Sequence, residues 1–522
     1  MKGSIELHCF WFSISVMKNK LILYLLPFLL LVDISCTPLE GGKGKALFES
    51  QCTSCHLLPE VGQLPKKLWK KKVLPEMAAR MGIQDTAFDP YEGYSFDEQY
   101  AMVQSGVYSV PPTISKKEWQ LLVDYIISNA PDSLEKLAKK PSIKNLEQFS
   151  PSPIDIDSTE GSFLTSIQYD VDKSEILTGD LRGSILSYDR RNRELNRELN
   201  IGKPITSIIK KDNIIYATTV AFLDPSELVT GHISMLQDSS RQQLPFEFHR
   251  PVHTLIHDFD KNGTQEIVVC EFGNLTGQLS ILFMGDDSKY DTKALLNQPG
   301  TIRTIADDMD GDGLDDLLVM TTQGDEGITI FYQTENLGFR PKKVLRFSPL
   351  YGSSWFELLD YDNDGDKDII TVHGDNGDKT PILKPYHGLR IHLNDGNNQF
   401  SEAFFYPFYG ATRSVSRDFD QDGDFDIALV STFPDYEDHP EKTFVYLENK
   451  NSTNFSFEAF GLPTDISGRW FLLDAGDFDN DGDDDIVLTC FTYSFNPLPD
   501  DLKVQWNDSD FDMVIFENDL LD

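Results

Sequence analysis

Two cysteines and a histidine near the start of the chain have types and a spacing that could bind a metal or a cofactor. They lie in the stretch QCTSCHLLP, residues 51–59, as Cys52, Cys55 and His56. A C-x-x-C pair occurs in zinc sites, in redox-active dithiols and at haem attachment sites. A zinc ribbon needs a second ligand pair, and the 522 residues contain no second C-x-x-C. A thioredoxin-like dithiol lies in a βαβ unit, and no such pattern surrounds these cysteines.

Covalent attachment of haem is the chemistry that fits this set. Two thiols on one helical turn can add to two vinyl groups, and a histidine beside them can take the iron from the proximal face. The flanking sequence predicts two helices. Before the motif, GKALFESQ has Gly44 and Phe48 at helical spacing, and after it SKKEWQLLVDYIISNAP forms a capped helix. One face of that second helix would carry Trp119, Leu122 and Ile126.

These features resemble a small class I cytochrome c over residues 41–131. In that family the first helix crosses the last at a glycine and an aromatic residue, and the haem lies against both. The resemblance implies an all-α domain with one covalent haem c, attached through Cys52 and Cys55 and with His56 as the proximal ligand.

The sixth iron ligand is commonly a methionine in that family, and a methionine raises the haem potential, which suits electron transfer. Met77, in KKVLPEMAARMG, is the favoured candidate. Met81 is the alternative, one helical turn later, and Met102 is third. The chain departs from the family before the last helix, where VYSVPPTIS has Val110 in the methionine position.

A second group of chemically active residues repeats along the remainder of the chain. The segments are DFDKNGTQEIVV, DMDGDGLDDLLV, DYDNDGDKDIIT, DFDQDGDFDIAL and DFDNDGDDDIVL, and their first residues lie 50 to 59 positions apart. Oxygen ligands at positions 1, 3, 5 and 9, with glycine at 6 and a backbone carbonyl at 7, let a loop wrap a hard cation such as calcium. The expected calcium ligands are Asp258, Asp260, Asn262, Glu266, Asp308, Asp310, Asp312, Asp316, Asp360, Asp362, Asp364, Asp368, Asp418, Asp420, Asp422, Asp426, Asp477, Asp479, Asp481 and Asp485.

An EF-hand does not explain these loops, because position 12 is not glutamate and an apolar strand follows instead of a helix. The pattern resembles FG-GAP or VCBS repeats, whose best-known relatives are the cation loops of integrin α-subunit propellers. The resemblance implies a β-propeller with about five calcium ions, each in a loop that joins the first two strands of a blade. Their expected role is to support folding, since adjacent carboxylates repel one another without a cation.

The expected fold is a mainly β protein with a seven-bladed propeller over residues 161–522, preceded by the all-α cytochrome domain. Five blades carry the acidic loops. Two more are expected at residues 166–189 and 206–223, where strand patterns occur without a complete loop, and an eight-bladed ring is the alternative. Residues 132–160 are polar and contain several prolines, which predicts an extended linker.

The net charge limits the possible partners of the protein, and the N-terminal sequence predicts its location. There are 46 basic against 84 acidic residues, a net charge of -38, which argues against nucleic acid as a partner. Residues 1–36 have the basic start and apolar core of an export signal, with Met17 as an alternative start, and they resemble a bacterial lipoprotein signal with Cys36 as the lipidated residue. We therefore expect an exported protein, held by a lipid anchor at the periplasmic or outer surface of a Gram-negative envelope. Cys270 and Cys490 are expected to be buried free thiols.

Three functions are compatible with this organisation. The first is a haem c electron-transfer protein whose propeller serves as a docking or binding scaffold, with a redox partner protein in the envelope. A run of five lysines, LPKKLWKKKVLPEM, could dock an acidic partner or lie on a membrane surface. The second is a propeller dehydrogenase that passes electrons to its own haem, and the third is a surface protein that binds a glycan or a protein.

No catalytic constellation is evident, so we assign no catalytic residue and expect an electron carrier or a binding protein more than an enzyme. The histidine candidates for a catalytic role are His249, His253, His257, His387 and His392. The tryptophan candidates for lining a sugar site are Trp355, Trp470 and Trp506.

Overall fold

The computed structural model describes residues 40–84, 88–137, 143–157, 159–237, 240–285, 287–377, 380–463, 466–493 and 498–521. These belong to one compact unit, Glu40–Asp522. The expected export signal and Cys36 lie outside the described residues. No helix among the described residues is long and apolar enough to cross a membrane.

The first part of the unit is helical. Its elements are α1 (Glu40–Cys52), η1 (Val61–Gln63), α2 (Lys66–Leu68), η2 (Trp69–Val73), α3 (Leu74–Arg80), α4 (Phe96–Ser105) and α5 (Lys116–Asn129). The two longer helices that follow the C-x-x-C-H motif begin at capping boxes, because Ser95 and Ser115 each accept the backbone N–H of a glutamate three residues later.

Helices α1 and α5 cross at Gly44, which agrees with the crossing that the resemblance implies. A Cβ on Gly44 would lie 2.4 Å from the carbonyl oxygen of Leu121 and 2.8 Å from the Cβ of Tyr125, so only glycine allows this approach. Four residues later, the ring centroid of Phe48 lies 5.7 Å from that of Tyr125. The small core beneath the crossing contains Phe48, Leu64, Trp69, Leu74, Leu122 and Ile126.

Replacing Gly44 should therefore destabilise the helical part. In Gly44→Ala the new methyl group forces α1 and α5 apart, and overpacking of this kind costs about 1–3 kcal/mol. Gly62→Ala is the matched control, because no atom lies within 4 Å of a Cβ at that position. We expect thermal unfolding, followed by far-UV circular dichroism, to occur earlier in Gly44→Ala than in Gly62→Ala, and equal melting would show that the helices do not cross at Gly44.

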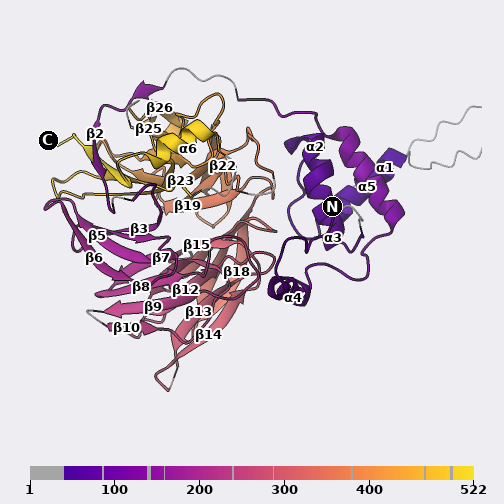
Figure 1. The fold of residues 1–522 in the computed structure, drawn as a ribbon, viewed down its shortest axis with the longest axis horizontal. Helices are drawn as coiled ribbons and strands as arrows, with labels where there is room; N and C mark the ends of the chain where they lie inside the picture. Colours follow the sequence, from indigo (N-terminus) through magenta and orange to yellow (C-terminus); the bar gives the residue numbers. More distant parts are fainter. Residues whose placement is uncertain are drawn as a thin grey trace, which may run out of the picture. The chain divides into compact units, whose positions relative to one another are not determined.

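The remainder of the chain forms seven sheets, numbered here as blades 1 to 7 in chain order. Within blades 1 to 6, consecutive strands pair antiparallel from the inside to the outside (Figure 1). Blades 1 to 3 comprise β3 (Leu164–Asp170), β4 (Glu175–Asp180), β5 (Ser184–Asp189), β6 (Glu194–Asn200); β7 (Ile205–Lys211), β8 (Ile214–Thr219), β9 (His232–Gln237), β10 (Ser240–Gln243); and β11 (Pro251–His257), β12 (Glu266–Glu271), β13 (Gln278–Met284), β14 (Tyr290–Leu296).

Blades 4 to 7 have the same design. They comprise β15 (Thr301–Asp307), β16 (Asp316–Thr321), β17 (Gly327–Thr334), β18 (Gly338–Arg346); β19 (Ser353–Leu359), β20 (Asp368–His373), β21 (Gly388–Asn394), β22 (Phe400–Pro407); β23 (Ala411–Arg417), β24 (Asp426–Ser431), β25 (Phe444–Asn451), β26 (Ser456–Gly461); and β27 (Trp470–Gly476), β28 (Asp485–Cys490), β29 (Met513–Asn518), β2 (Phe149–Ile154). A 3-10 turn, η3 (Ser452–Asn454), and a helix, α6 (Asp500–Asn507), lie in connections. The first strand of each blade contacts the first strand of both neighbouring blades, which closes the ring and confirms the prediction of seven blades.

Strand β2 closes the ring from the opposite end of the chain. It pairs antiparallel with β29 and so supplies the outer strand of blade 7. A two-residue strand, β1 (Lys144–Asn145), pairs with β26 of blade 6. Both strands lie in residues 132–160, which the sequence assigns to the linker. Pro151 and Pro153 explain why this strand is hard to recognise, since proline is tolerated in a sheet only at an edge, where β2 lies.

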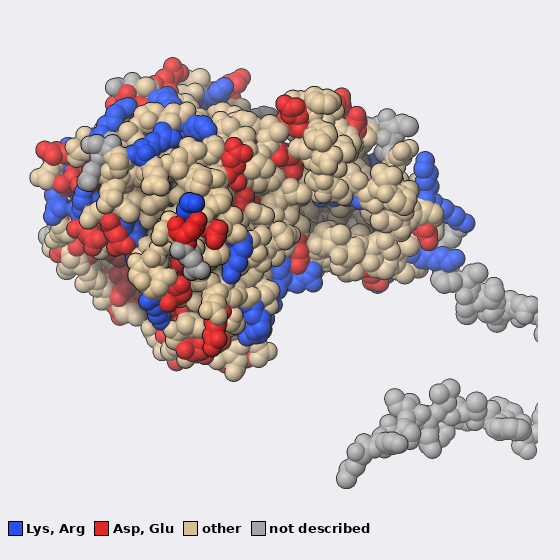
Figure 2. Space-filling view, turned by 90° about the horizontal axis from the view of Figure 1, so that it is seen from below, with Lys and Arg blue, Asp and Glu red and all other residues tan. Residues whose placement is uncertain are grey.

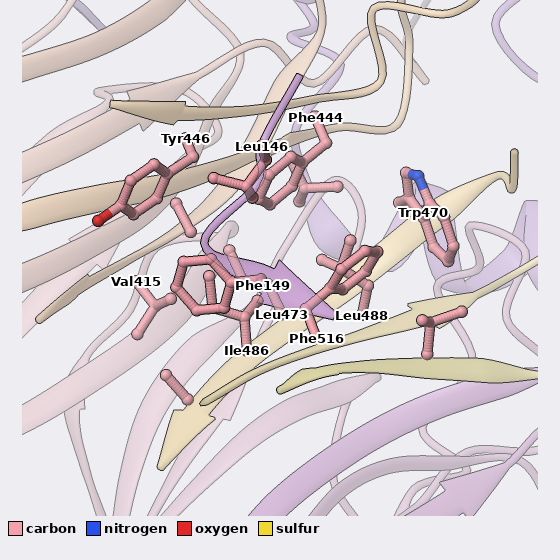
Figure 3. Packing of buried hydrophobic residues seen from close by; sticks show 14 of the residues in the cluster. Leu146, Phe149, Val415, Phe444, Tyr446, Trp470, Leu473, Ile486, Leu488 and Phe516 are labelled. Atoms are coloured by element: carbon pink, nitrogen blue, oxygen red, sulfur yellow. The ribbon is translucent and has the colours of Figure 1, made fainter. Parts of the chain in front are cut away.

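The propeller core lies between neighbouring blades. The second strand of each of blades 3 to 7 is buried along its whole length; these strands are β12, β16, β20, β24 and β28. Because both faces are covered, their sequences are mostly apolar and do not alternate between apolar and polar residues. Between blades 6 and 7, Phe149 of β2 packs among Leu473, Ile486 and Phe516 (Figure 3). The long-range closure is therefore held by apolar packing as well as by strand pairing. Cys270 and Cys490 lie in this interior as free thiols, as expected.

Candidate metal and cofactor sites

The C-x-x-C-H motif begins at the end of a helix. Cys52 is the last residue of α1 and is partly buried, whereas Cys55 is exposed. Burial, and secondarily the neighbouring Cys55, raises the pKa of the Cys52 thiol to about 11. A redox-active C-x-x-C pair needs a thiol pKa lowered below its ordinary value, so this environment disfavours a dithiol catalyst.

One ring nitrogen of His56 is held by the backbone. Its Nδ1 lies 2.8 Å from the carbonyl oxygen of Leu57, a distance at which Nδ1–H donates to the carbonyl. That tautomer leaves the lone pair on Nε2, which is the usual arrangement of a metal-binding histidine. The donor set of two thiols and one imidazole nitrogen therefore fits the proximal side of a haem.

The three candidate methionines differ in their surroundings. Met77 and Met81 are both partly buried, whereas Met102 is 2 % exposed and belongs to the packed interior. The backbone of Met81 is fixed by the segment before α5, because Thr113 N–H donates to the Met81 carbonyl at 2.9 Å. Val110, which lies where class I cytochromes c have a methionine, is 94 % exposed. The protein geometry therefore keeps both Met77 and Met81 as candidates.

The segment after His56 also contacts the propeller. Ser348 Oγ donates to the side-chain oxygen of Gln63 at 2.7 Å, and the hydroxyl of Tyr386 donates to the Gln63 carbonyl at 2.9 Å. Leu350 joins the apolar cluster of the helices. The helical core is thus continuous with the connections around blade 5.

Most of the candidate histidines lie apart from one another. His249 contacts the carbonyl oxygen of Ser226, His253 contacts that of Thr304, and His257 Nε2 lies 2.8 Å from a carboxylate oxygen of Asp315. These contacts are structural, and the three residues do not form a catalytic group.

His392 differs, because it ends a buried chain of polar contacts in blade 5. Ser353 Oγ donates to Glu326 at 2.6 Å and lies 3.0 Å from His373 Nδ1. Thr371 Oγ1 then lies 2.8 Å from His373 Nε2 and 3.0 Å from His392 Nε2. His387, also a candidate, is fully buried nearby in the chain, and both of its ring nitrogens lack a hydrogen-bond partner among the described residues.

The exposure of the side chains decides the roles of two tryptophan candidates and of the lysine run. Trp470 and Trp506 are 0 % and 2 % exposed, so they are core residues and cannot line a sugar site. In the lysine run, Lys66 pairs with Asp132 at 3.2 Å. The remaining four lysines, Lys67, Lys70, Lys71 and Lys72, are exposed.

The five acidic loops lie where the sequence predicts, between the first and second strands of blades 3 to 7. In each loop, three carboxylates have ligand atoms within 4.8 Å of one another. In blades 3, 4 and 5 these are positions 1, 3 and 9, and in blades 6 and 7 they are positions 1, 3 and 5. The grouped residues are Asp258, Asp260 and Glu266; Asp308, Asp310 and Asp316; Asp360, Asp362 and Asp368; Asp418, Asp420 and Asp422; and Asp477, Asp479 and Asp481.

The loop backbone is fixed by its own carboxylates. In blade 5, the N–H of Gly365 at position 6 donates to Asp360 at position 1 over 3.1 Å, and Gly365 has a φ of +99°. Gly423 in blade 6 repeats this arrangement, with a φ of +100° and a 3.1 Å bond to Asp418. Position 6 therefore needs glycine for its backbone conformation, as expected.

Two stretches of the chain, residues 308–371 and 418–488, match the family model described as an FG-GAP-like repeat. The chain carries FG-GAP-like repeats. Each matched stretch begins at the first aspartate of an acidic loop, and together they span the loops of blades 4 to 7. No curated protein matches the chain.

Several solved structures are similar in shape at low sequence identity. The Pan2 WD40 domain of Neurospora crassa has 12 % identity and a TM-score of 0.43, and the match covers 72 % of this chain and 97 % of that one. The N-terminal domain of Nup159 has 13 % identity and a TM-score of 0.41, over 72 % and 96 % of the two chains. YCF48 bound to a D1 peptide has 7 % identity and a TM-score of 0.43, over 72 % and 99 %.

The carboxylate at position 9 of the FG-GAP-like loops also accepts hydrogen bonds from the backbone of its own blade. In blade 5, Asp368 accepts the N–H of Tyr361 at 2.9 Å and that of Asn394 in the third strand at 2.9 Å. Asp485 makes the equivalent contacts in blade 7, with the N–H groups of Phe478 and Asn518. This carboxylate therefore ties the loop to the middle of the blade, in addition to facing the expected cation.

Position 7 contributes a carboxylate that the sequence analysis missed. The calcium-loop pattern predicts only a backbone carbonyl at this position, but in blades 5, 6 and 7 the residue is Asp366, Asp424 and Asp483. Each has a buried oxygen without a hydrogen-bond partner among the described residues. Burial, and then repulsion by the other loop aspartates, raises the pKa of Asp424 to about 6. Buried oxygens that lack a donor fit a cation ligand, and the acidic residue type at position 7 was the available signal.

Without a cation, the loops should make stability depend on pH. Burial is the main reason that the pKa of Asp485 rises to about 8 and that of Asp426 to about 7, against about 4 in an unfolded chain. The folded protein then binds more protons than the unfolded chain. The contribution of these two carboxyl groups to the free energy of unfolding is therefore greatest below about pH 4, and it decreases as the pH rises to about 8.

This dependence can be measured on protein that has been stripped of metal and desalted into metal-free buffer. We expect its melting temperature to decrease between about pH 5 and 8, because these carboxylates must ionise while buried. Saturating calcium should flatten the slope, since a bound cation stabilises the ionised form. A metal-free slope that is flat or rises with pH would contradict the loop electrostatics.

The loop between the first two strands of blade 1 lacks the complete acidic pattern, and a lysine side chain lies beside its aspartate. Asp170 forms an ion pair with Lys210, which comes from blade 2. An ammonium group therefore balances the carboxylate charge in a loop that has lost its glycine and most of its aspartates.

On the face shown in Figure 2, acidic side chains gather in separate clusters with Lys and Arg side chains between them, so the large negative charge is divided among local sites.

Proposed function

We propose that the helical part carries one covalent haem c and that the protein transfers electrons in the cell envelope. The observation that supports this most strongly is the geometry around the motif. Cys52 ends α1, which crosses α5 at Gly44, and the Nδ1 contact of His56 leaves its Nε2 free for iron. The cysteines would form the two thioether links, His56 would be the proximal ligand, and the bound haem would supply one-electron redox chemistry.

The propeller serves in this proposal as a calcium-stabilised scaffold. Gln63 and Leu350 join the haem-binding part to the connections around blade 5, which supports a fixed mounting of the redox centre. The four exposed lysines of the run are a suitable docking surface for an acidic redox partner. Export and lipid anchoring through Cys36 complete the proposal, with the protein at the periplasmic or outer surface of the envelope.

A redox titration tests this function. The protein is expressed with cytochrome maturation factors, purified, and followed at the haem absorption band while donors, acceptors and candidate substrates are added. We expect reversible one-electron reduction by chemical mediators and no reduction by sugars or alcohols alone. A protein without haem c bands after such expression would refute the proposal.

A propeller dehydrogenase is the second candidate, and one feature favours it. A pocket of about 290 Å³ is lined by Leu57, Leu58 and Gln63 on the helical side and by Tyr351, His392 and Glu402 on the propeller side. His392 connects this pocket to the buried chain that ends at Glu326, so a proton could be passed inward. Haem reduction by an added sugar or alcohol, lost in His392→Ala, would favour this candidate over the first.

The sixth ligand can be assigned by variants of the loaded protein. We expect Met77→Ala to abolish the methionine-to-iron charge-transfer band and to lower the midpoint potential, because a thioether ligand raises it. Met102→Ala is a control, since that side chain is 2 % exposed and packs in the interior. The same loss in Met81→Ala, with Met77→Ala unchanged, would assign the ligand to Met81.

A further inference from the structure

Three residues meet at one level of the inner strands of blades 4, 5 and 6. Arg303 of β15, Trp355 of β19 and Arg413 of β23 each follow a register shift in the first strand. They pair with Met320, Val372 and Val430 of the second strands, which are corresponding positions. The first strands contact one another around the ring, so these three residues lie on the strands that surround the propeller axis.

The three side chains form a stack. The guanidinium carbon of Arg303 lies 3.5 Å from the ring centroid of Trp355, and that of Arg413 lies 3.9 Å from it. One arginine comes from the blade before Trp355 and the other from the blade after it. All three residues are partly exposed, so solutes can reach the stack.

Most of the donors on this stack have no acceptor. Among the described residues, neither arginine lies within ion-pair distance of a carboxylate, and Arg413 makes no hydrogen bond. Arg303 donates only from Nε, to the carbonyl oxygen of Phe356 at 3.0 Å. The indole Nε1 of Trp355 is buried without a partner in the same part of the chain. The buried indole N–H without a partner calls for an explanation, because buried donors in folded proteins are nearly always paired.

Nearby acidic groups do not supply the missing acceptors. Glu357 accepts from the hydroxyls of Ser414 and Ser416 and from the Ser416 N–H at 2.9 Å. Asp474 accepts the backbone N–H groups of Ala475 at 3.0 Å and Tyr169 at 3.2 Å. Both carboxylates are thus held by their own surroundings.

The two arginines place positive charge at this level, and the carboxylates of Glu357 and Asp474 lie near enough to attract both guanidinium groups. Burial, and then the adjacent Arg303, lowers the pKa of Arg413 to about 9, and burial lowers that of Arg303 to about 10, so both remain charged at neutral pH. His253, at the same level of blade 3, has its pKa lowered to about 3 by burial and by the arginines, so it is neutral.

We propose that Arg303, Trp355 and Arg413 form a binding site for a small oxyanion on the propeller axis. A carboxylate or a tetrahedral oxyanion would accept guanidinium N–H groups in the paired geometry that arginine favours. The site is separate from the C-x-x-C-H motif and from the acidic loops, and it does not depend on the haem.

Binding can be tested by calorimetric and fluorescence titration of the full chain with sulfate and, separately, with acetate, at constant ionic strength. Phosphate and citrate are avoided because both compete for calcium. We expect saturable binding of at least one probe with a change in tryptophan emission. Arg413→Gln should weaken binding at least tenfold, and Trp355→Phe should lose the emission change.

Arg340→Gln is the matched control, because its guanidinium carbon lies 5.0 Å from the Tyr332 ring but the residue is exposed in an outer strand. Arg413→Lys keeps the charge without the fork of donors, so it reports on geometry if Arg413→Gln does not fold. Sulfate preferred over acetate would assign a tetrahedral oxyanion, and the reverse a carboxylate. Absence of saturable binding in the native chain, or equal binding by Arg413→Lys and Arg340→Gln, would overturn the proposal.

Discussion

Removal of calcium should lower the melting temperature of the propeller by roughly 10 °C or more, since each occupied site adds a few kcal/mol at saturating calcium. The loops of blades 3 to 7 bring three carboxylates within 4.8 Å in every case, and this arrangement is repulsive without a cation. A bound calcium ion would supply the missing positive charge and would be a partner for the buried oxygens of Asp366, Asp424 and Asp483, which lack donors. Differential scanning calorimetry in calcium and in EGTA measures the shift.

A substitution in one loop measures how much that loop contributes to the loss of melting temperature on calcium removal. Asp418→Asn should lower the melting temperature in calcium and reduce the further loss on adding EGTA, because one site has already been weakened. Asp287→Asn is the control: this aspartate is exposed, in a turn of blade 3 outside the acidic loops. Melting that is identical with and without EGTA would mean that the loops do not hold cations.

Replacement of both motif cysteines should abolish covalent haem. In Cys52→Ala/Cys55→Ala neither thioether link can form, so we expect no haem absorption in the denatured and washed protein. His56→Ala should retain the covalent link but change the spectrum, because the proximal nitrogen has been removed.

The matched control for the thiols is Cys270→Ala. Cys270 is fully buried in blade 3 and belongs to the propeller core, so this change should cost some stability without affecting haem attachment. Haem that persists covalently in the double cysteine variant, or that is lost in Cys270→Ala, would show that the attachment site lies elsewhere.

The propeller was predictable because its repeats carry a local signal. Each acidic loop precedes an apolar strand, and glycine at position 6 marks a turn that other residues adopt only with strain. Two blades without complete loops were still counted correctly from their strand patterns. The spacing of Gly44 and Phe48 predicted a helix, and the crossing of α1 and α5 was expected from the resemblance to class I cytochromes c.

Features that depend on distant partners were harder to predict. Strand β2 pairs with β29 more than 350 residues away, and its prolines conceal it. The second role of Asp368 needs the third strand of its blade to be placed first. The Arg303, Trp355 and Arg413 stack did leave a signal, because each residue lies five positions before the first aspartate of its loop. Alignment of the repeats would have placed the three at one level, but not shown that they touch.

Intact-protein mass spectrometry under denaturing conditions is the most direct test of the haem proposal. The chain is expressed with cytochrome maturation factors, extracted with acidified solvent to remove any non-covalent haem, and weighed. We expect the mass of the processed polypeptide plus one haem, with the added mass located on the peptide that contains Cys52 and Cys55. A mass equal to that of the polypeptide alone, from protein whose propeller is folded and binds calcium, would contradict the proposal.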